Sequence, residues 1–281
     1  MSSVKDLKFK LYNGVEIPSI GFGTWQISND DVYQATLEAL KAGYRHIDTA
    51  YRYENEEGVG RAIKDSGIPR EEIFVTTKLP SDIKSYEGAV YHFNDSLKKL
   101  GLDYIDLYLI HAPWPWSMVG RNCRDKNADV WKAFEEFYLA KKVRAIGISN
   151  FNRNDITHLI NHSQIKPMVN QIQYNICKTE EDVVNCCKEN GILVEAYSPI
   201  ATGRLLNNAN IEKIAEKYNK SVAQICIRYC LEQGIVALPK AVKKDHILAN
   251  IDVDFHISEE DMDYLKSLAD PSDRYENLKH V

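Results

Sequence analysis

The chain has 281 residues, of which 44% are hydrophobic and 27% are charged, and its formal net charge is −5. These values are typical of a globular protein with a large core, and the scattered basic residues exclude a general attraction to nucleic acid or to an anionic membrane. The polar first ten residues do not resemble an export signal and no apolar run reaches about 20 residues, so we expect a cytoplasmic protein with a small-molecule partner.

The first predicted element is a β-hairpin. Asn13 and Gly14 separate two short β-like segments, at residues 8–11 and 15–17. The pair Asn-Gly readily takes the positive φ angles of a two-residue type I′ turn, so we predict that turn here.

Eight short β-like runs follow the hairpin, separated by segments whose apolar residues recur every three or four positions, as in helices. The runs lie at residues 19–22, 44–47, 73–77, 105–110, 143–148, 168–172, 192–197 and 235–238. Several of them are mostly apolar, as expected for parallel strands that helices cover on both faces. Eight such units in about 250 residues predict an α/β protein of the TIM-barrel type, a closed (β/α)8 barrel.

The alternative fold is an open doubly wound sheet, which usually carries the motif GxGxxG after its first strand. Here Gly21 and Gly23 are followed by Thr24 and Trp25, so that motif is missing. No Pro-, Gly- or Ser-rich linker divides the chain, and we therefore expect one domain over residues 1–281.

Polar residues end the predicted strands, where a parallel barrel has its active site. They are Asp48, Lys78, His111, Ser149, Asn150, Gln171, Tyr197, Ser198 and Lys240. Each alone has an ordinary structural explanation, such as a helix N-cap or a solvated charge. Together they supply an acid, a base, a cation and neutral hydrogen-bonding groups without the spacing of metal ligands, which predicts a metal-free redox or proton-transfer site.

The six cysteines form no CxxC pair, and without an export signal they should stay reduced. Cys226 and Cys230 are four residues apart on a predicted helix, where two metal ligands could meet. Packing as small buried apolar residues is the favoured interpretation of this pair, and we predict no metal site.

Six ordered segments carry a resemblance to a known family, at residues 21–25, 43–50, 53–56, 74–79, 106–111 and 143–151. Through them the chain resembles the aldo-keto reductases over essentially its full length. The resemblance implies an enzyme that reduces small aldehydes or ketones to alcohols by hydride transfer, with NADPH as the cofactor and NADH also possible. We expect it to be a monomer.

The resemblance also implies four catalytic residues, Asp48, Tyr53, Lys78 and His111. As hydride reaches a carbonyl carbon, negative charge grows on the oxygen, and a positioned acid can protonate it. Tyr53 would be that acid, and the ammonium of Lys78 would bring the Tyr53 pKa closer to neutral pH. Asp48 would hold Lys78 as an ion pair, and His111 would orient the substrate oxygen.

The residues that would hold the cofactor come from the same resemblance. Ser149, Asn150 and Gln171 would bind the nicotinamide carboxamide, Tyr197 would stack on the ring, and the loop after Tyr197 would lie against the pyrophosphate. The full expected set is Gly23, Thr24, Trp25, Asp48, Ser149, Asn150, Gln171, Tyr197, Ser198, Pro199, Ile200, Lys240, Ala241, Val242, His246 and Asn250.

The adenosine end of this set departs from the family pattern. Ala241 stands where the family usually has a serine, and His246 stands where it usually has an arginine. Lys240 is still able to bind a 2′-phosphate, and Asn250 is still able to bind the adenine. Because histidine is mostly neutral at pH 7, the preference between NADPH and NADH stays open.

The expected walls of the substrate pocket are Trp25, Tyr51, Tyr53, His111 and Trp114, with Trp116 as a further candidate. Only 13 residues follow Leu268, which predicts a short carboxyl-terminal segment and an open, permissive site.

Two other functions stay open at this point. One is an NAD(P)H-binding regulatory or interaction module on the same barrel, although cofactor binding alone does not require Asp48, Lys78 and Tyr53 together. The other is a metal-dependent barrel hydrolase, for which the sequence lacks the ligand spacing.

Overall fold

The computed structural model describes residues 3–269. Its strands are β1 (Lys8–Lys10), β2 (Glu16–Pro18), β3 (Phe22–Gly23), β4 (His46–Asp48), β5 (Phe74–Leu79), β6 (Ile105–Ile110), β7 (Val143–Ser149), β8 (Val169–Gln173), β9 (Leu193–Tyr197) and β10 (Val236–Leu238). Its α-helices are α1 (Asn29–Ala42), α2 (Glu56–Asp65), α3 (Tyr86–Leu100), α4 (Arg124–Leu139), α5 (Arg153–Asn161), α6 (Glu181–Glu189), α7 (Ala209–Lys217), α8 (Val222–Glu232), α9 (Lys244–Ile251) and α10 (Glu259–Ser267). Short 3-10 helices lie at Tyr51–Tyr53, Arg70–Glu72, Trp116–Met118 and Ala201–Asn207.

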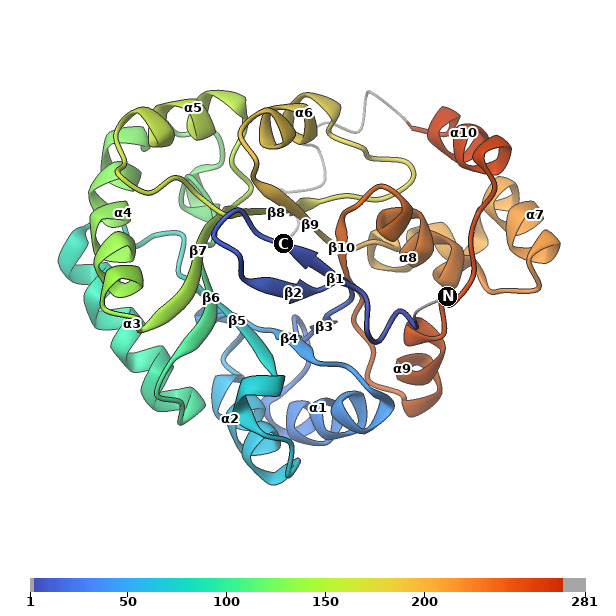
Figure 1. Cartoon of the computed structure of the whole chain (residues 1–281), viewed down its shortest axis with the longest axis horizontal. Coiled ribbons are helices and arrows are strands. Elements are labelled where there is room, and N and C mark those ends of the chain that lie inside the picture. The colour runs from blue at the N-terminus through green and yellow to red at the C-terminus, as the bar shows by residue number, and fades with distance from the viewer. Residues whose placement is uncertain (1–2, 270–281) are drawn as a thin grey trace.

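Strands β3 to β10 form one parallel sheet in chain order, and the two ends of this sheet meet. Ile20 forms a parallel bridge with Ala237, and the Gly21 amide donates to Ala237 O at 2.8 Å. The Gly23 amide donates to Pro239 O at 3.0 Å. The predicted TIM barrel is therefore confirmed, and Figure 1 shows the helices arranged around it.

The first barrel strand is shorter than the run at residues 19–22 predicts. The Ala237 amide donates to Ser19 O at 3.0 Å, so the chain just before β3 pairs with β10, whereas the register of β3 with β4 begins at Phe22. Residues 19–21 therefore pair with β10 and close the barrel, and pairing with β4 begins only at Phe22.

The predicted amino-terminal hairpin is present, but its turn differs from the prediction. β1 and β2 pair antiparallel, and the Gly14 amide donates to Leu11 O at 2.9 Å with φ +90° at Gly14. A type I′ turn needs positive φ at both central residues, and Asn13 does not have it. The prediction of a two-residue type I′ turn is therefore wrong. The Asn13 side chain instead accepts from the Val15 amide at 3.1 Å and donates to Arg144 O at 3.0 Å. These contacts hold Asn13 in an ordinary conformation and leave the left-handed position to glycine.

The hairpin covers the amino-terminal end of the barrel. Asn13 reaches Arg144 at the start of β7, and the Tyr12 hydroxyl donates to Lys166 O, just before β8, at 2.6 Å. Figure 1 shows β1 and β2 lying across the middle of the barrel. The opposite end, where the strands finish, is therefore the end available for a functional site.

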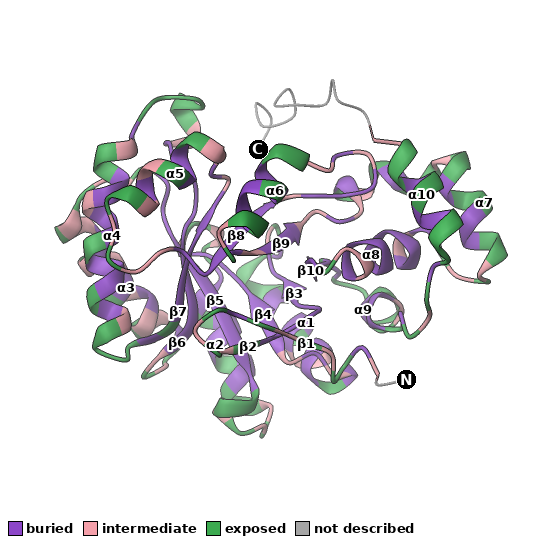
Figure 2. Cartoon of the chain, turned by 45° about the horizontal axis from the view of Figure 1, so that its top comes forward, coloured by how far each residue is buried: buried purple, intermediate pink, exposed green. Residues whose placement is uncertain are grey.

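Helix α1 illustrates how the local sequence sets the helix limits. The Ser28 side chain accepts from the Asp31 amide at 3.1 Å at its start, and Gly43 ends it with φ 109°. Between these limits Val32, Ala39 and other apolar side chains are buried against the barrel. Figure 2 shows the same division in other helices, with buried residues toward the strands and exposed residues outside.

No helix within residues 3–269 has the length and apolar character needed to cross a membrane. The expectation of a short carboxyl-terminal segment concerns residues that lie mostly outside the described range.

Candidate active site

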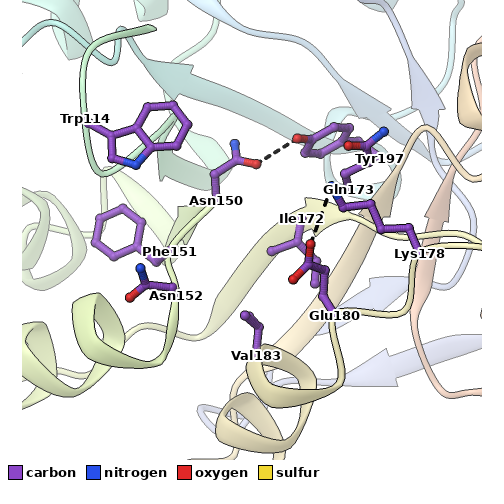
Figure 3. A pocket seen from close by; sticks show the side chains of 10 residues that line it. All are labelled: Trp114, Asn150, Phe151, Asn152, Ile172, Gln173, Lys178, Glu180, Val183 and Tyr197. Atoms are coloured by element: carbon purple, nitrogen blue, oxygen red, sulfur yellow. Dashed lines mark hydrogen bonds and ion pairs between the residues drawn. The ribbon is translucent and has the colours of Figure 1, made fainter. Parts of the chain in front are cut away.

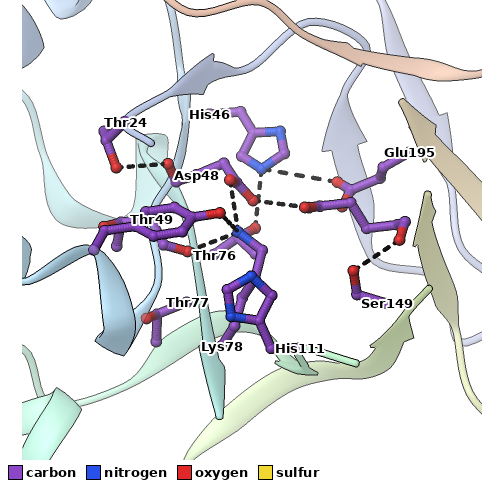
Figure 4. Close-up of polar contacts among 12 residues, drawn as sticks. Thr24, His46, Asp48, Thr49, Thr76, Thr77, Lys78, His111, Ser149 and Glu195 are labelled. Carbon is purple, nitrogen blue, oxygen red and sulfur yellow. Dashed lines mark hydrogen bonds and ion pairs between the residues drawn. The ribbon is translucent and has the colours of Figure 1, made fainter. Parts of the chain in front are cut away.

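The carboxyl ends of the barrel strands bring the predicted polar side chains together. Asp48 ends β4, Lys78 lies one residue before the end of β5, and His111 follows β6 directly. Ser149 ends β7, and Tyr197 ends β9. Because neighbouring parallel strands pair in register, these residues share one mouth, as Figure 4 shows for several of them.

Lys78 is the centre of the contacts at this mouth. Its side chain is fully buried, and Nζ donates to Asp48 Oδ1 at 2.7 Å and to Thr49 O at 2.8 Å. The same nitrogen donates to Tyr53 Oη at 3.4 Å and lies 5.0 Å from the centre of the Tyr53 ring. The three partners use all three hydrogens of an ammonium group, so Lys78 is held in one orientation.

Burial and the charges around Lys78 together set the pKa values at this mouth. Burial lowers the Lys78 pKa, but the interactions with its neighbours, chiefly the Asp48 carboxylate, more than offset this, so its pKa is raised and it stays an ammonium. Burial raises the pKa of Tyr53, and the opposing effect of Lys78 is smaller. Lys78 therefore lowers the Tyr53 pKa in the expected direction, but burial outweighs this effect and the Tyr53 pKa lies above its ordinary value. Tyr53 keeps its proton at neutral pH and is able to donate it.

His111 lies beside Tyr53, with ring centres 5.6 Å apart in an edge-to-face arrangement. Burial and the nearby Lys78 charge hold the pKa of His111 well below its ordinary value, so its imidazole is neutral. Its Nδ1 has no hydrogen-bond partner among the described residues. A neutral imidazole beside a phenol places two hydrogen-bonding groups where one substrate oxygen would lie.

The residues expected to bind a carboxamide form a connected set. Ser149 Oγ donates to Gln171 O at 2.8 Å, and Asn150 Nδ2 donates to Ser149 Oγ at 3.0 Å and to His111 O at 3.1 Å. Asn150 takes a left-handed backbone conformation with φ 62°, and its Oδ1 accepts from the Tyr197 hydroxyl at 2.7 Å. This set thus lies directly beside His111.

Other expected cofactor residues lie near β3 and after β9. Thr24 is fully buried and its hydroxyl donates to Asp48 O at 3.0 Å, so its side chain supports Asp48, while Trp25 is half-buried. At Gly23 an added Cβ would lie 3.4 Å from Leu238 O, which shows how closely β3 approaches β10. The loop that begins at Ser198 has φ 52° at its first residue and continues with Pro199 and Ile200.

The adenosine-end residues lie after β10, with Lys240, Ala241 and Val242 before α9 and His246 and Asn250 within it. Lys240, Val242 and His246 are exposed, whereas Ala241 and Asn250 are buried. Lys243 and Lys244 are exposed beside them, and Lys244 Nζ lies 3.2 Å from Glu38 Oε2. The exposed lysines and His246 thus lie just before α9 or in its first turn.

Tyr51 does not lie where the sequence analysis expects it. Its hydroxyl donates to Asp95 Oδ2 at 2.9 Å, and Lys99 Nζ lies 3.6 Å from the centre of its ring. Asp95, Lys99 and the neighbouring His92 belong to α3, outside the barrel. The assignment of Tyr51 to the substrate pocket is therefore corrected, because α3 offers its hydroxyl a carboxylate partner away from the mouth.

Two tryptophans stand beside His111. Trp116 lies with its ring centre 6.1 Å from that of His111, and Trp114 packs edge-on against Trp116 at 5.0 Å. Trp114 is also part of a pocket between the loops that follow β7 and β8 (Figure 3). The pocket is lined by Trp114, Asn150, Phe151, Asn152, Ile172, Gln173, Lys178, Glu180, Val183 and Tyr197.

A second set of polar residues lies one layer deeper inside the barrel and was missed by the sequence analysis. Glu195 is fully buried, and its Oε2 accepts from Gln171 Nε2 at 2.9 Å. His46 Nε2 lies 2.9 Å from Thr76 Oγ1 and 3.9 Å from Glu195 Oε1 (Figure 4). A signal was available, because Glu195 and His46 each stand two residues before a strand-end residue, Tyr197 and Asp48, and so share its face.

Burial keeps both of these deeper groups uncharged. It lowers the pKa of His46 to about 3, with a further contribution from Lys78. It raises the pKa of Glu195 to about 8, and the Asp48 carboxylate adds to the effect. In this cluster of described residues, Lys78 and Asp48 therefore form an ion pair, and His46 and Glu195 below it are neutral.

Glu195 makes the stability of the fold depend on pH. Its pKa rises from 4.5 to about 8 on folding, so as the pH rises the unfolded chain loses this proton first. The stabilisation is full below about pH 4.5 and is lost by about pH 8. Relative to Glu195→Gln, we expect the free energy of unfolding of the wild type to fall by several kcal/mol between about pH 5 and about pH 8, measured by urea denaturation.

The comparison with Glu195→Gln removes the contributions that both proteins share, including that of His46. A difference in unfolding free energy that stays constant over this range would show that Glu195 is ionised in the folded protein.

Chemically, the mouth combines a protonated phenol, an ammonium beside it and a neutral imidazole. Such a set is able to hold a carbonyl oxygen, protonate it and stabilise the resulting phenolate. No group of three or more His, Cys, Asp or Glu side chains that could hold a metal ion is present among residues 3–269.

Comparison with known proteins gives a consistent result. The model of the Aldo/keto reductase family matches residues 19–270. The glyoxal reductase of Bacillus subtilis is 45% identical over 269 residues, which cover 95% of this chain and 94% of that relative.

Solved structures show the same similarity. MGS-M4, an aldo-keto reductase from a Medee basin deep-sea metagenome library, is 46% identical, has a TM-score of 0.88, and the match covers 94% of this chain and 95% of that chain. An aldo-keto reductase of Bombyx mori in complex with NADP is 37% identical, has a TM-score of 0.84, and the match covers 94% of this chain and 92% of that chain.

Proposed function

Because the chain belongs to the aldo/keto reductase family, we propose that it reduces aldehydes and ketones to alcohols with NAD(P)H and with Tyr53 as the proton donor. The observation that supports this role of Tyr53 is the contact of its hydroxyl with the buried Lys78–Asp48 ion pair. Family membership makes the chain an NAD(P)H-dependent oxidoreductase, whereas the residue roles are our proposal.

The residues at the mouth fit the nicotinamide end of the cofactor. Ser149, Asn150 and Gln171 place hydroxyl and amide groups together beside the Tyr197 ring. No described residue donates to Gln171 Oε1, which leaves an acceptor for a carboxamide N–H. When bound, the reduced nicotinamide supplies the hydride.

The protein groups carry the proton chemistry. His111 and Tyr53 hold the carbonyl oxygen, and the Tyr53 proton moves from its Oη to that oxygen as negative charge develops there. The phenolate that remains on Tyr53 is stabilised by the ammonium of Lys78, which Asp48 keeps charged. Thr49 O fixes the same ammonium from the other side.

We propose small aldehydes, ketones and α-dicarbonyl compounds as the substrates. Trp114 and Trp116 form an aromatic wall beside His111, which suits the apolar part of a small carbonyl compound. The glyoxal reductase of Bacillus subtilis, at 45% identity, supports testing α-dicarbonyls first. We also propose that the whole chain is one domain and acts as a monomer in the cytoplasm.

The direct test follows the absorbance of reduced nicotinamide with NADPH and NADH in parallel, against a panel of small aldehydes, ketones and α-dicarbonyls. We expect turnover with at least one cofactor and several carbonyls. Saturable cofactor binding without turnover over the whole panel, in folded protein, would instead support the NAD(P)H-binding module on the same barrel.

His246 gives a prediction about cofactor preference. Lys240 and His246 are both exposed, Lys240 before α9 and His246 in its first turn, and we propose that the 2′-phosphate of NADPH binds there. A guanidinium is always charged and binds phosphate through two parallel hydrogen bonds. We expect His246→Arg to raise the ratio of kcat/KM for NADPH over NADH by about tenfold, because a charge-assisted hydrogen bond contributes about 1.5 kcal/mol.

The matched control for this change is Lys213→Arg, which alters an exposed cation on α7 away from the proposed phosphate site. An unchanged cofactor ratio in His246→Arg would place the 2′-phosphate elsewhere.

A further inference from the structure

The Gln171 side chain is held by two carboxyl groups on different strands. Its Nε2 donates to Asp48 Oδ2 at 2.8 Å and to Glu195 Oε2 at 2.9 Å. An amide nitrogen has two hydrogens, so both are used. The nitrogen of Gln171 therefore faces the interior of the barrel, and the amide oxygen faces away from both carboxyl groups.

The orientation of this amide is fixed by charge as well as by geometry. Asp48 accepts hydrogen bonds from Lys78 and Gln171 on its two oxygens. A reversed amide would place the Gln171 oxygen against the Asp48 carboxylate and remove that hydrogen bond. Glu195, the pairing partner of Gln171 in the β8–β9 ladder, accepts the second N–H and completes the arrangement.

Burying the Glu195 carboxyl group at this position is unfavourable for the stability of the fold. Its side chain has no exposed surface, and its Oε1 has no hydrogen-bond partner among the described residues. This Oε1 lies 3.9 Å from Nε2 of the neutral His46, which is too far for a hydrogen bond. An apolar residue would satisfy the packing of an inward-facing strand position without this unpaired atom. The hydrogen bond to Gln171 is the contact that an apolar residue would lose.

We infer that Glu195 is a positioning residue that holds the Gln171 amide so that Oε1 can accept a hydrogen bond from the nicotinamide carboxamide. This inference rests on the proposed function. Lys78, Asp48, Gln171 and Glu195 then form one hydrogen-bonded chain that links the proton donor Tyr53 to the group that holds the cofactor.

The test compares Glu195→Met and Glu195→Gln by NADPH titration, read from protein and cofactor fluorescence without turnover. Glu195→Met removes the acceptor and keeps an apolar side chain of similar length, so we expect NADPH affinity to fall about fivefold to tenfold. Glu195→Gln keeps a neutral oxygen acceptor, and we expect its affinity to stay within about twofold of the wild type. We expect kcat to change less than the cofactor KM, because Tyr53 and Lys78 are untouched.

A double-variant cycle separates positioning from general destabilisation. If Glu195 acts through Gln171, then Glu195→Met combined with Gln171→Met will bind NADPH no more weakly than Gln171→Met alone. The matched control is Glu135→Met, a buried glutamate on α4 that accepts from the Gln164 and Ile165 amides. It should lower the melting temperature and leave NADPH affinity unchanged.

Three results would overturn the inference: wild-type affinity in folded Glu195→Met, an equal loss in Glu195→Gln, or additive losses in the double variant. None of these would affect the proposed function, which fails separately if the wild type shows no turnover over the carbonyl panel.

Discussion

Replacing Tyr53 with phenylalanine is expected to lower kcat for carbonyl reduction by about 10²- to 10⁴-fold, while NADPH affinity stays within about twofold. The substitution removes the hydroxyl that contacts Lys78 and keeps the ring that packs against His111. Because burial raises the Tyr53 pKa, this hydroxyl carries its proton at neutral pH, and phenylalanine has none to give. Steady-state kinetics and fluorescence titration with NADPH measure the two quantities.

Tyr51→Phe is the matched control for this prediction. It removes a hydroxyl two residues away that donates to Asp95 on α3, outside the mouth. We expect this variant to retain turnover near the wild-type level. Full activity in Tyr53→Phe, or a large loss of activity in Tyr51→Phe, would show that Tyr53 is not the proton donor.

Replacing Lys78 with methionine is expected to affect both catalysis and folding. Turnover should fall by about 10²-fold or more, because the phenolate on Tyr53 loses the ammonium that stabilises it. The free energy of unfolding should fall by about 3–5 kcal/mol, because Asp48 is left as a buried carboxylate without its cation. Urea denaturation near neutral pH measures the second effect.

The double variant Lys78→Met with Asp48→Asn distinguishes the two effects. Removing both charges eliminates the unpaired carboxylate, so we expect much of the stability to return while turnover stays low. Recovery of turnover in the double variant would contradict the proposed role of Lys78. A stability as low as that of the single variant would show that Asp48 is not the source of the loss.

The order of strands and helices could be predicted from the sequence because it depends on local periodicity. Mostly apolar runs such as residues 105–110 and 143–148 correspond to β6 and β7 within one residue at either end. The predictions were weaker where pairing is not local, as before β3, where residues pair with β10 at the far end of the sheet. The turn of the hairpin was also decided by a distant contact, between Asn13 and Arg144.

The candidate site could be predicted in part for the same reason. Parallel strands all end at one mouth, so a strand-end position is enough to place Asp48, Lys78 and His111 near one another. The family resemblance distinguished Tyr53 from Tyr51, and the structure shows the physical difference, because one hydroxyl meets Lys78 and the other meets Asp95.

By itself, then, the sequence determined the barrel, the family and the residue types that end its strands, because these depend on local patterns and on ordered motifs. The tertiary structure decided which of those residues touch and which protonation states result. Gln171 and Asp48 are 123 positions apart and form one hydrogen bond, and Glu195 joins them from a third strand. Burial, which no local pattern measures, raises the pKa of Tyr53 against the pull of Lys78 and keeps Glu195 neutral. Hydrogen bonds and desolvation depend on which residues are close in the folded chain. For that reason the buried contacts of Glu195 and His46 could be identified only from the tertiary structure.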